Sequence, residues 1–209
     1  MLDVEKSVAA GFRNLHLKKS IKPGKKIGIA VGSRGIAGLT PAVKTAVDEI
    51  KTKGAYPYIV AAMGSHGGGT KEGQIQILND LGITENSIGA PILAEAESIE
   101  LGKVKGTPLY VNSLAFEFDS LIIINRVKPH TSFRGEIESG LIKMLVAGLG
   151  GIKGAEVLHE GGSEKIPEKL VELGQELVKK LPILDKKKLV GIITQTDLLK
   201  IVSIKWMLE

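Results

Sequence analysis

The sequence predicts an α/β fold: a three-layer, mostly parallel, Rossmann-like sheet with helices on both of its faces. Two observations come from the first third of the chain, where apolar strands at residues 26–31 and 56–63 are each followed by a glycine-rich loop and then a helix. The third is the run SLIIINRV at residues 120–127, which is apolar almost without interruption, as a parallel strand buried on both faces must be.

The elements in the first part of the chain are predicted from spacing, capping and turn residues. Apolar residues at helical spacing within residues 1–19 predict a short amphipathic helix. After the first glycine loop, Thr40 and Pro41 are the residue types expected at the N-cap and at the first position of a helix, which Gly54 ends. After the second loop, Thr70 is the expected N-cap of the next helix.

The second half of the chain contains fewer clear signals for where helices and strands begin and end. Residues 83–118 are mixed, and we expect short strands there. Residues 137–149 have the spacing of a helix, and residues 163–180 predict a charged helix with one apolar face. A last strand at residues 189–194 and a helix beginning at Asp197 are expected to close the chain.

The composition excludes several classes of protein. The 209 residues include no cysteine, which rules out a disulfide scaffold, a thiolate zinc site, an iron–sulfur cluster and a cysteine nucleophile. Aromatic residues make up 4% of the chain, and base-stacking modules need exposed rings, so no nucleic-acid partner is expected. No apolar run approaches the roughly 18 residues that span a bilayer, and the N-terminus lacks an apolar signal core, so we expect a cytoplasmic protein without a membrane partner.

Polar residues gather where three of the predicted strands end. Ser33 and Arg34 follow the first strand, His66 follows the second, and Lys128 and His130 follow the third. Ligands of open parallel sheets bind at these carboxyl ends, where two histidines can act as base and acid on opposite faces of one substrate or only cap backbone groups. The first glycine loop is either a tight turn or an anion site built on a helix N-terminus. Arg34 favours the anion site, and we group Ser33 with it as a cofactor-binding candidate.

Lys143 and His159 are the other two candidates. Lys143 lies in an apolar, small-residue helical stretch, where a buried ammonium is costly unless it is paired or used. The alternative is a lysine that reaches solvent along one face of the helix. His159 follows a glycine-rich turn and either serves the site or simply ends a helix. His16 lies in a lysine-rich segment and is expected on the surface.

Taken in order, these residues resemble a known family. Arg34, the tripeptide at residues 64–66 (GSH), the tripeptide at 128–130 (KPH), the run SGLIK at 139–143 and His159 are similar to the N-terminal domain of nickel-dependent lactate racemase and the related nickel-pincer-nucleotide isomerases. The resemblance covers about residues 25–165. It rests on the ordered set in an α/β context, since no one motif is specific.

The resemblance implies a role for each matched residue. His66 and His130 correspond to the paired acid/base histidines, and Arg34 corresponds to the arginine that binds the substrate carboxylate or the cofactor phosphate. Lys143 corresponds to the lysine that holds the nickel-pincer nucleotide through a thioamide-type covalent link, and His159 to the histidine that ligates nickel. A chain without cysteine can still bind nickel, because this cofactor supplies the sulfur ligands.

The sequence departs from the family's pattern in two places. The aspartate that the family's first loop often carries just before the arginine is missing, and the segment between His130 and Lys143 is longer than in the racemase itself. We therefore expect a related enzyme whose substrate is another small 2-hydroxy acid or a sugar acid.

The expected organisation is a lactate-racemase-like N-terminal catalytic domain at residues 1–180 and a tail at residues 181–209. The tail is either the final strand and helix of that domain or a fragment that resembles the end of a CBS motif, a module that binds adenosine nucleotides. Members of the family usually carry a second domain that closes over the site, and we expect it to be absent here. A separate partner chain that supplies it, or a homo-oligomer, is the expected protein partner.

Two functions stay open at this point. The first is a racemase- or epimerase-type isomerase that combines hydride transfer to the cofactor with paired-histidine acid/base chemistry. The second is a non-catalytic or truncated domain that binds an anionic ligand or a partner chain. Nickel in the protein and a mass addition on Lys143 would favour the first.

Overall fold

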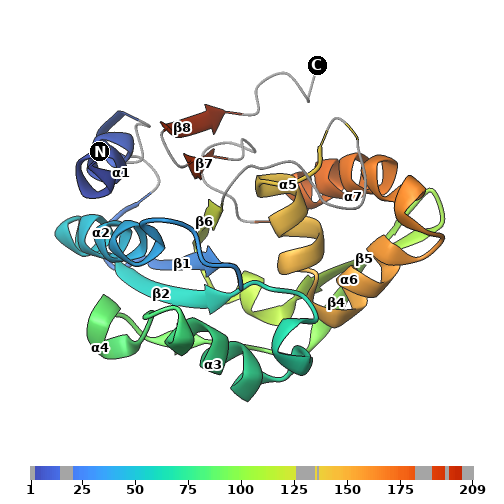
Figure 1. Ribbon diagram of the computed structural model, residues 1–209, viewed down its shortest axis with the longest axis horizontal. Coiled ribbons are helices and arrows are strands. Elements are labelled where there is room, and N and C mark those ends of the chain that lie inside the picture. Colours follow the sequence, from blue (N-terminus) through green and yellow to red (C-terminus); the bar gives the residue numbers. More distant parts are fainter. Residues whose placement is uncertain are drawn as a thin grey trace.

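The fold is organised around a six-stranded sheet (Figure 1). The computed structural model describes residues 3–14, 21–125, 135, 137–181, 190–195 and 198–203. Within them the strand order is β3-β2-β1-β6-β7-β8. These strands are β1 (Lys26–Val31), β2 (Tyr56–Ala61), β3 (Ile92–Leu93), β6 (Ser120–Asn125), β7 (Val190–Gln195) and β8 (Leu198–Ser203). Neighbours are parallel except for β7 and β8, which confirms the predicted mostly parallel, Rossmann-like sheet.

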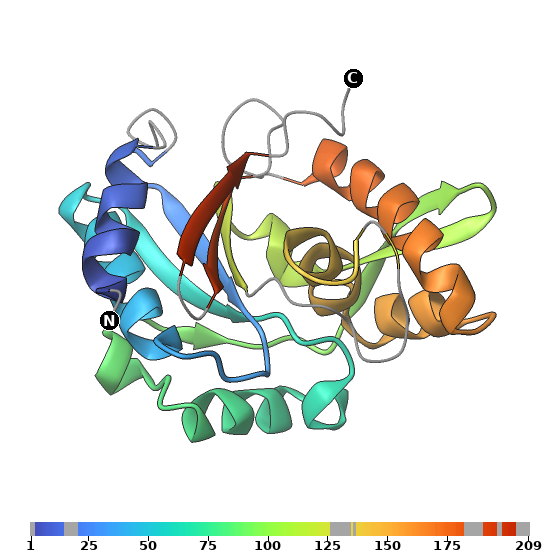
Figure 2. The ribbon, with the colours of Figure 1, turned by 45° about the horizontal axis from the view of Figure 1, so that its top comes forward.

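Helices cover both faces of the sheet (Figure 2). One group is α1 (Val4–Asn14), α2 (Leu39–Thr52), α3 (Lys71–Asp80) and α4 (Glu85–Ile88). The other is α5 (Leu141–Lys143), the π-helical turn η4 (Met144–Gly148), α6 (Gly151–His159) and α7 (Ile166–Lys180). Short 3₁₀ turns form at η2 (His66–Gly69), η3 (Ser113–Phe116) and η5 (Ser163–Lys165), and β4 (Ser98–Val104) pairs antiparallel with β5 (Thr107–Asn112). None of the described helices is long and apolar enough to cross a bilayer.

Alternate residues of the central strands point into two separate apolar clusters. In β6, Ile122 and Ile124 pack with residues of α1, α2, α3 and α4, whereas Leu121 and Ile123 pack with residues of α5, η4 and α7. All four side chains are buried. Because successive side chains of a strand point to opposite faces, a strand covered on both faces must be apolar at every position. This explains the apolar run on which the fold prediction rests.

The helix ends follow the predicted residues at one position and differ at another. Thr70 is the N-cap of α3, as predicted, and its side chain accepts a hydrogen bond from the Gly73 N–H. At α2, however, the N-cap is Gly38, whose φ of +77° favours glycine, and not Thr40. The Thr40 hydroxyl instead donates to the Leu81 carbonyl oxygen at 3.0 Å, so it joins α2 to the end of α3.

The end of the chain differs from its prediction more strongly. The prediction of a helix beginning at Asp197 is wrong, because residues 198–203 form β8. This strand runs antiparallel to β7, which itself pairs with β6 in the main sheet. The predicted helix at residues 1–19 is confirmed as α1 within the part of that segment that the structure describes.

Candidate functional site

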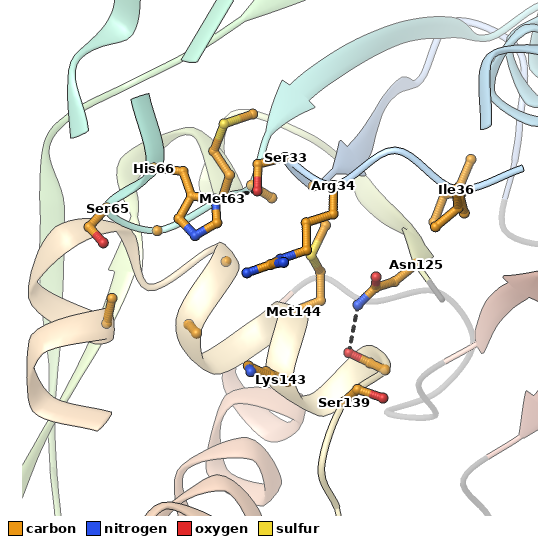
Figure 3. Close-up of a pocket in the computed structure, with 18 of the residues that line it drawn as sticks. Ser33, Arg34, Ile36, Met63, Ser65, His66, Asn125, Ser139, Lys143 and Met144 are labelled. Atoms are coloured by element: carbon orange, nitrogen blue, oxygen red, sulfur yellow. Dashed lines mark hydrogen bonds between the residues drawn. The ribbon is translucent and has the colours of Figure 1, made fainter. Parts of the chain in front are cut away.

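The carboxyl ends of β1, β2 and β6 open into one cavity of about 430 Å³. Its walls come from the loops after β1 and β2, the end of β6, and the segment from Ser139 through η4 to α6 (Figure 3). This is the edge at which open parallel sheets bind their ligands. The lining includes Ser33, Arg34, His66, Lys143 and His159, all predicted from the sequence. The remaining predicted site residue, His130, lies outside the described residues, as does Lys128.

The described lining carries positive charge and no carboxylate. Figure 3 shows the Arg34 guanidinium reaching across the cavity from the loop after β1, with Lys143 on the helix below it. Most of the other walls are glycine or apolar side chains, among them Ile36, Met63 and Met144. Two cations in a partly apolar cleft favour a ligand that carries at least one negative charge.

His66 contacts the neighbouring loop through its ring. Its Nδ1 is hydrogen-bonded to the Oγ of Ser33, so the loops after β1 and β2 meet at this pair. Partial shielding from solvent lowers the pKa of His66 below its usual value, and the charges of Arg34 and Lys143 lower this pKa further. The imidazole is therefore neutral at neutral pH, which is the form that accepts a proton.

Lys143 ends the single turn of α5 and is followed at once by the π-helical turn η4. Its neighbours Leu141, Ile142 and Met144 are buried against the core, while Lys143 is half-buried in the cavity wall. The lysine is thus directed into the cavity by the apolar packing of the residues around it. Single π-helical turns are frequent at functional sites, where they shift the register of a helix.

Gly64 connects the loop that carries His66 to the segment that carries Lys143. The Gly64 N–H donates to the Gly148 carbonyl oxygen at 3.0 Å, and its own carbonyl accepts from Nε2 of Gln74 at 3.0 Å. The peptide is therefore held by η4 on one side and by α3 on the other. A Cβ at this position would lie 2.7 Å from the Ala147 carbonyl oxygen.

We expect Gly64→Ala to lower the free energy of unfolding by roughly 1–3 kcal/mol, because alanine is strained at a φ of +61° and clashes with Ala147. Gly68→Ala is the matched control, since Gly68 has a φ of +66° but open space where a Cβ would lie. Gly68→Ala should lower the free energy of unfolding by about 1 kcal/mol, because only the backbone strain contributes. Urea unfolding of both variants measures the difference. Equal losses would show that the close approach to Ala147 contributes nothing.

His159 is the last residue of α6 and presents one ring nitrogen for binding. Its Nδ1 lies 2.7 Å from the Ala155 carbonyl oxygen, which can only accept, so Nδ1 carries the proton. In the neutral form of the ring, Nε2 then carries the lone pair with which imidazole ligates a metal. The Lys169 ammonium donates to the Val157 and Glu160 carbonyl oxygens at 2.6 and 2.7 Å, which holds the end of α6 in place.

Two residues of this region were missed by the sequence reasoning. Gln74 is 4% exposed. The sequence did indicate its burial, because a residue four positions before the apolar Leu78 lies on the same inward face of α3. Asn125, at the end of β6, donates from Nδ2 to the Gly140 carbonyl oxygen at 2.9 Å and so ties the strand to the start of α5 (Figure 3). No pattern in the sequence pairs Asn125 with Gly140.

The described residues include no cluster of three or more histidine, cysteine, aspartate or glutamate side chains able to hold a metal ion. His159 Nε2 and the Lys143 amine, on two elements of one cavity, fit a group that needs one imidazole and one covalent anchor.

The fold and cavity define a mostly parallel α/β domain with a cationic cavity at its strand ends. Residues 2–165 match the family model described as the lactate racemase N-terminal domain. The chain belongs to this family, as the sequence predicted. Searches among curated proteins and among solved structures found no match.

Proposed function

We propose that the chain is a racemase- or epimerase-type isomerase that acts on a 2-hydroxy acid or a related sugar acid with the help of a nickel-pincer nucleotide. The observation that carries the proposal is the meeting of His66, Lys143 and His159 in one cationic cavity, although they lie far apart in the sequence. Membership of the lactate racemase family supports the reaction class.

Two residues would hold the cofactor. The Lys143 amine is the covalent anchor, and the half-buried position at the end of α5 keeps it inside the cavity. His159 Nε2 is the protein's ligand to nickel, oriented by the hydrogen bond from Nδ1 to Ala155. When bound, this group supplies a reversible acceptor for the hydride on the substrate's α-carbon.

The substrate is bound and deprotonated by side chains of the chain itself. Arg34 binds the carboxylate, for which its planar pair of N–H donors is suited. His66, neutral because its pKa is lowered, accepts the proton of the substrate's hydroxyl group. His130, which follows β6 in the sequence and lies outside the described residues, would serve the opposite enantiomer, so that each histidine acts as base in one direction and as acid in the other.

The proposal is tested on protein made in cells that also make the cofactor. Intact mass should show an addition on the peptide that bears Lys143, metal analysis should show nickel, and a panel of 2-hydroxy acids and sugar acids should include one that the protein epimerises. Loaded protein that binds such acids without turnover would instead favour a binding domain. Protein with neither nickel nor a mass addition would contradict the isomerase.

We expect His159→Ala to retain the mass addition on Lys143 but to lose nickel on gel filtration, because the anchor and the metal ligand are separate side chains on α5 and α6. Glu160→Ala is the control, since Glu160 is an exposed neighbour outside the cavity lining. Nickel and intact mass are measured on the same preparations. Equal nickel contents in the two variants would remove His159 from the proposed ligand set.

A further inference from the structure

The hydroxyl group of Ser33 meets His66 across two loops. Ser33 follows β1 and His66 follows β2, so only the side-by-side placement of these strands brings the residues together. Within the described residues, the ring of His66 is the hydrogen-bond partner of the Ser33 side chain. The contact involves Nδ1, which leaves Nε2 as the ring nitrogen available to a ligand.

This hydrogen bond allows two arrangements with opposite chemical results. If Nδ1–H donates to Ser33 Oγ, the neutral ring has its lone pair on Nε2 and is a base there. If the Ser33 O–H donates to Nδ1, the neutral ring carries its proton on Nε2 and cannot accept another at that atom. The tautomer of His66 is thus decided by the direction of a single hydrogen bond.

We propose that Ser33 is a positioning residue, whose Oγ accepts a hydrogen bond from Nδ1–H of His66 and so presents an unprotonated Nε2 to the cavity. The catalytic meaning of this role rests on the proposed function, in which His66 is a base. It assigns Ser33 a role through His66, whereas the sequence alone grouped it with the cofactor-binding residues.

The surroundings of the ring favour this direction. Arg34 and Lys143 are the charged groups whose field reaches His66, and both oppose a second proton on the ring. In Figure 3 the Arg34 guanidinium lies on the cavity side of the imidazole, and Ser33 lies beside the ring on the loop after β1. A positively charged donor group such as the Arg34 guanidinium is better matched by a lone pair at Nε2 than by an Nε2–H.

The test is nitrogen NMR of the full chain with ¹⁵N-labelled histidine, recorded above the pKa of His66 and without cofactor. A His66→Gln spectrum assigns the signals. We expect the Nδ1–H tautomer of His66 to predominate in the unmodified protein. In Ser33→Ala the ratio of Nδ1–H to Nε2–H should fall by roughly two- to tenfold, the range that one net hydrogen bond contributes.

Two variants separate this effect from damage to the loop. Ser33→Thr retains a hydroxyl and should restore the tautomer ratio, and Ser65→Ala removes an exposed hydroxyl next to His66 and should leave the ratio unchanged. A predominant Nε2–H tautomer in the unmodified protein, or an unchanged ratio in Ser33→Ala, would overturn the proposal. If Ser33→Ala is poorly folded, the tautomer in the unmodified protein and in Ser33→Thr decides the question.

The NMR result is independent of the enzyme assay. If the tautomer follows Ser33 but loaded protein isomerises no acid, the proposed function fails and the orienting role stands. If loaded protein is active, Ser33→Ala should lower kcat more than it raises KM, and Ser33→Thr should recover kcat. If the enzyme is active but the tautomer ratio of His66 does not change in Ser33→Ala, the inference about Ser33 is refuted and the proposed function stands.

Discussion

Lys143→Ala is expected to give a protein that folds, gains no mass in cofactor-making cells and shows no isomerisation above background. The residue is half-buried at the cavity, and its buried neighbours Leu141 and Ile142 supply the packing of α5. The substitution therefore removes the covalent anchor and leaves the apolar core intact. Intact mass, thermal unfolding and the isomerisation assay are measured together.

Lys153→Ala is the matched control for this change. Lys153 is an exposed lysine of α6 that lies over the Tyr110 ring and does not line the cavity. It should keep the mass addition and the activity. Lys143→Arg sharpens the test, because it keeps the positive charge but lacks the primary amine that a covalent link needs. A mass addition of the same size on Lys143→Ala would place the anchor elsewhere.

His66→Gln is expected to lower kcat by about 10²- to 10⁴-fold, the contribution of a general acid–base group, while leaving the unfolding free energy little changed. The reason for the small effect on folding is that His66 is exposed in the cavity, and its loop is held by the Gly64 peptide. Steady-state kinetics in both directions of the reaction measures kcat. The exposed neighbour Ser65 supplies the control, since Ser65→Ala should keep near-normal kinetics. If kcat falls only a few-fold, His66 does not act as a general acid or base in the reaction.

The pH profile offers a second check on the same residue. The base must be neutral to act, so kcat/KM falls as the pH drops through the pKa of His66. Because this pKa is lowered, the fall should begin below the usual value of 6.5. Arg34→Gln removes one of the two charges that lower the pKa, so the acid limb should move to higher pH. An acid limb that stays in place would show that the charge of Arg34 does not reach the ring.

The order of the elements and the edge that carries the site could be predicted from the sequence. Each apolar strand is followed by a glycine loop and a helix, and the carboxyl ends of parallel strands share one edge. Local signals of this kind placed Arg34 and His66 at this edge, whereas only the family resemblance linked Lys143 to them, and the structure brings all three to one cavity. The β8 strand was not predicted, although Ile201 and Val202 are residue types that favour strands, and only the structure shows its antiparallel pairing with β7.

The sequence by itself determined which chemical groups are present at the strand ends and that no cysteine thiolate is among them. Only the tertiary structure decided how those groups are oriented. The Ser33 hydroxyl faces the ring of His66, the Ala155 carbonyl oxygen accepts a hydrogen bond from His159 Nδ1–H, and Gly64 joins the loop to η4. Most of these contacts link residues distant in the sequence, and the direction of a hydrogen bond depends on atoms that only the folded chain brings together.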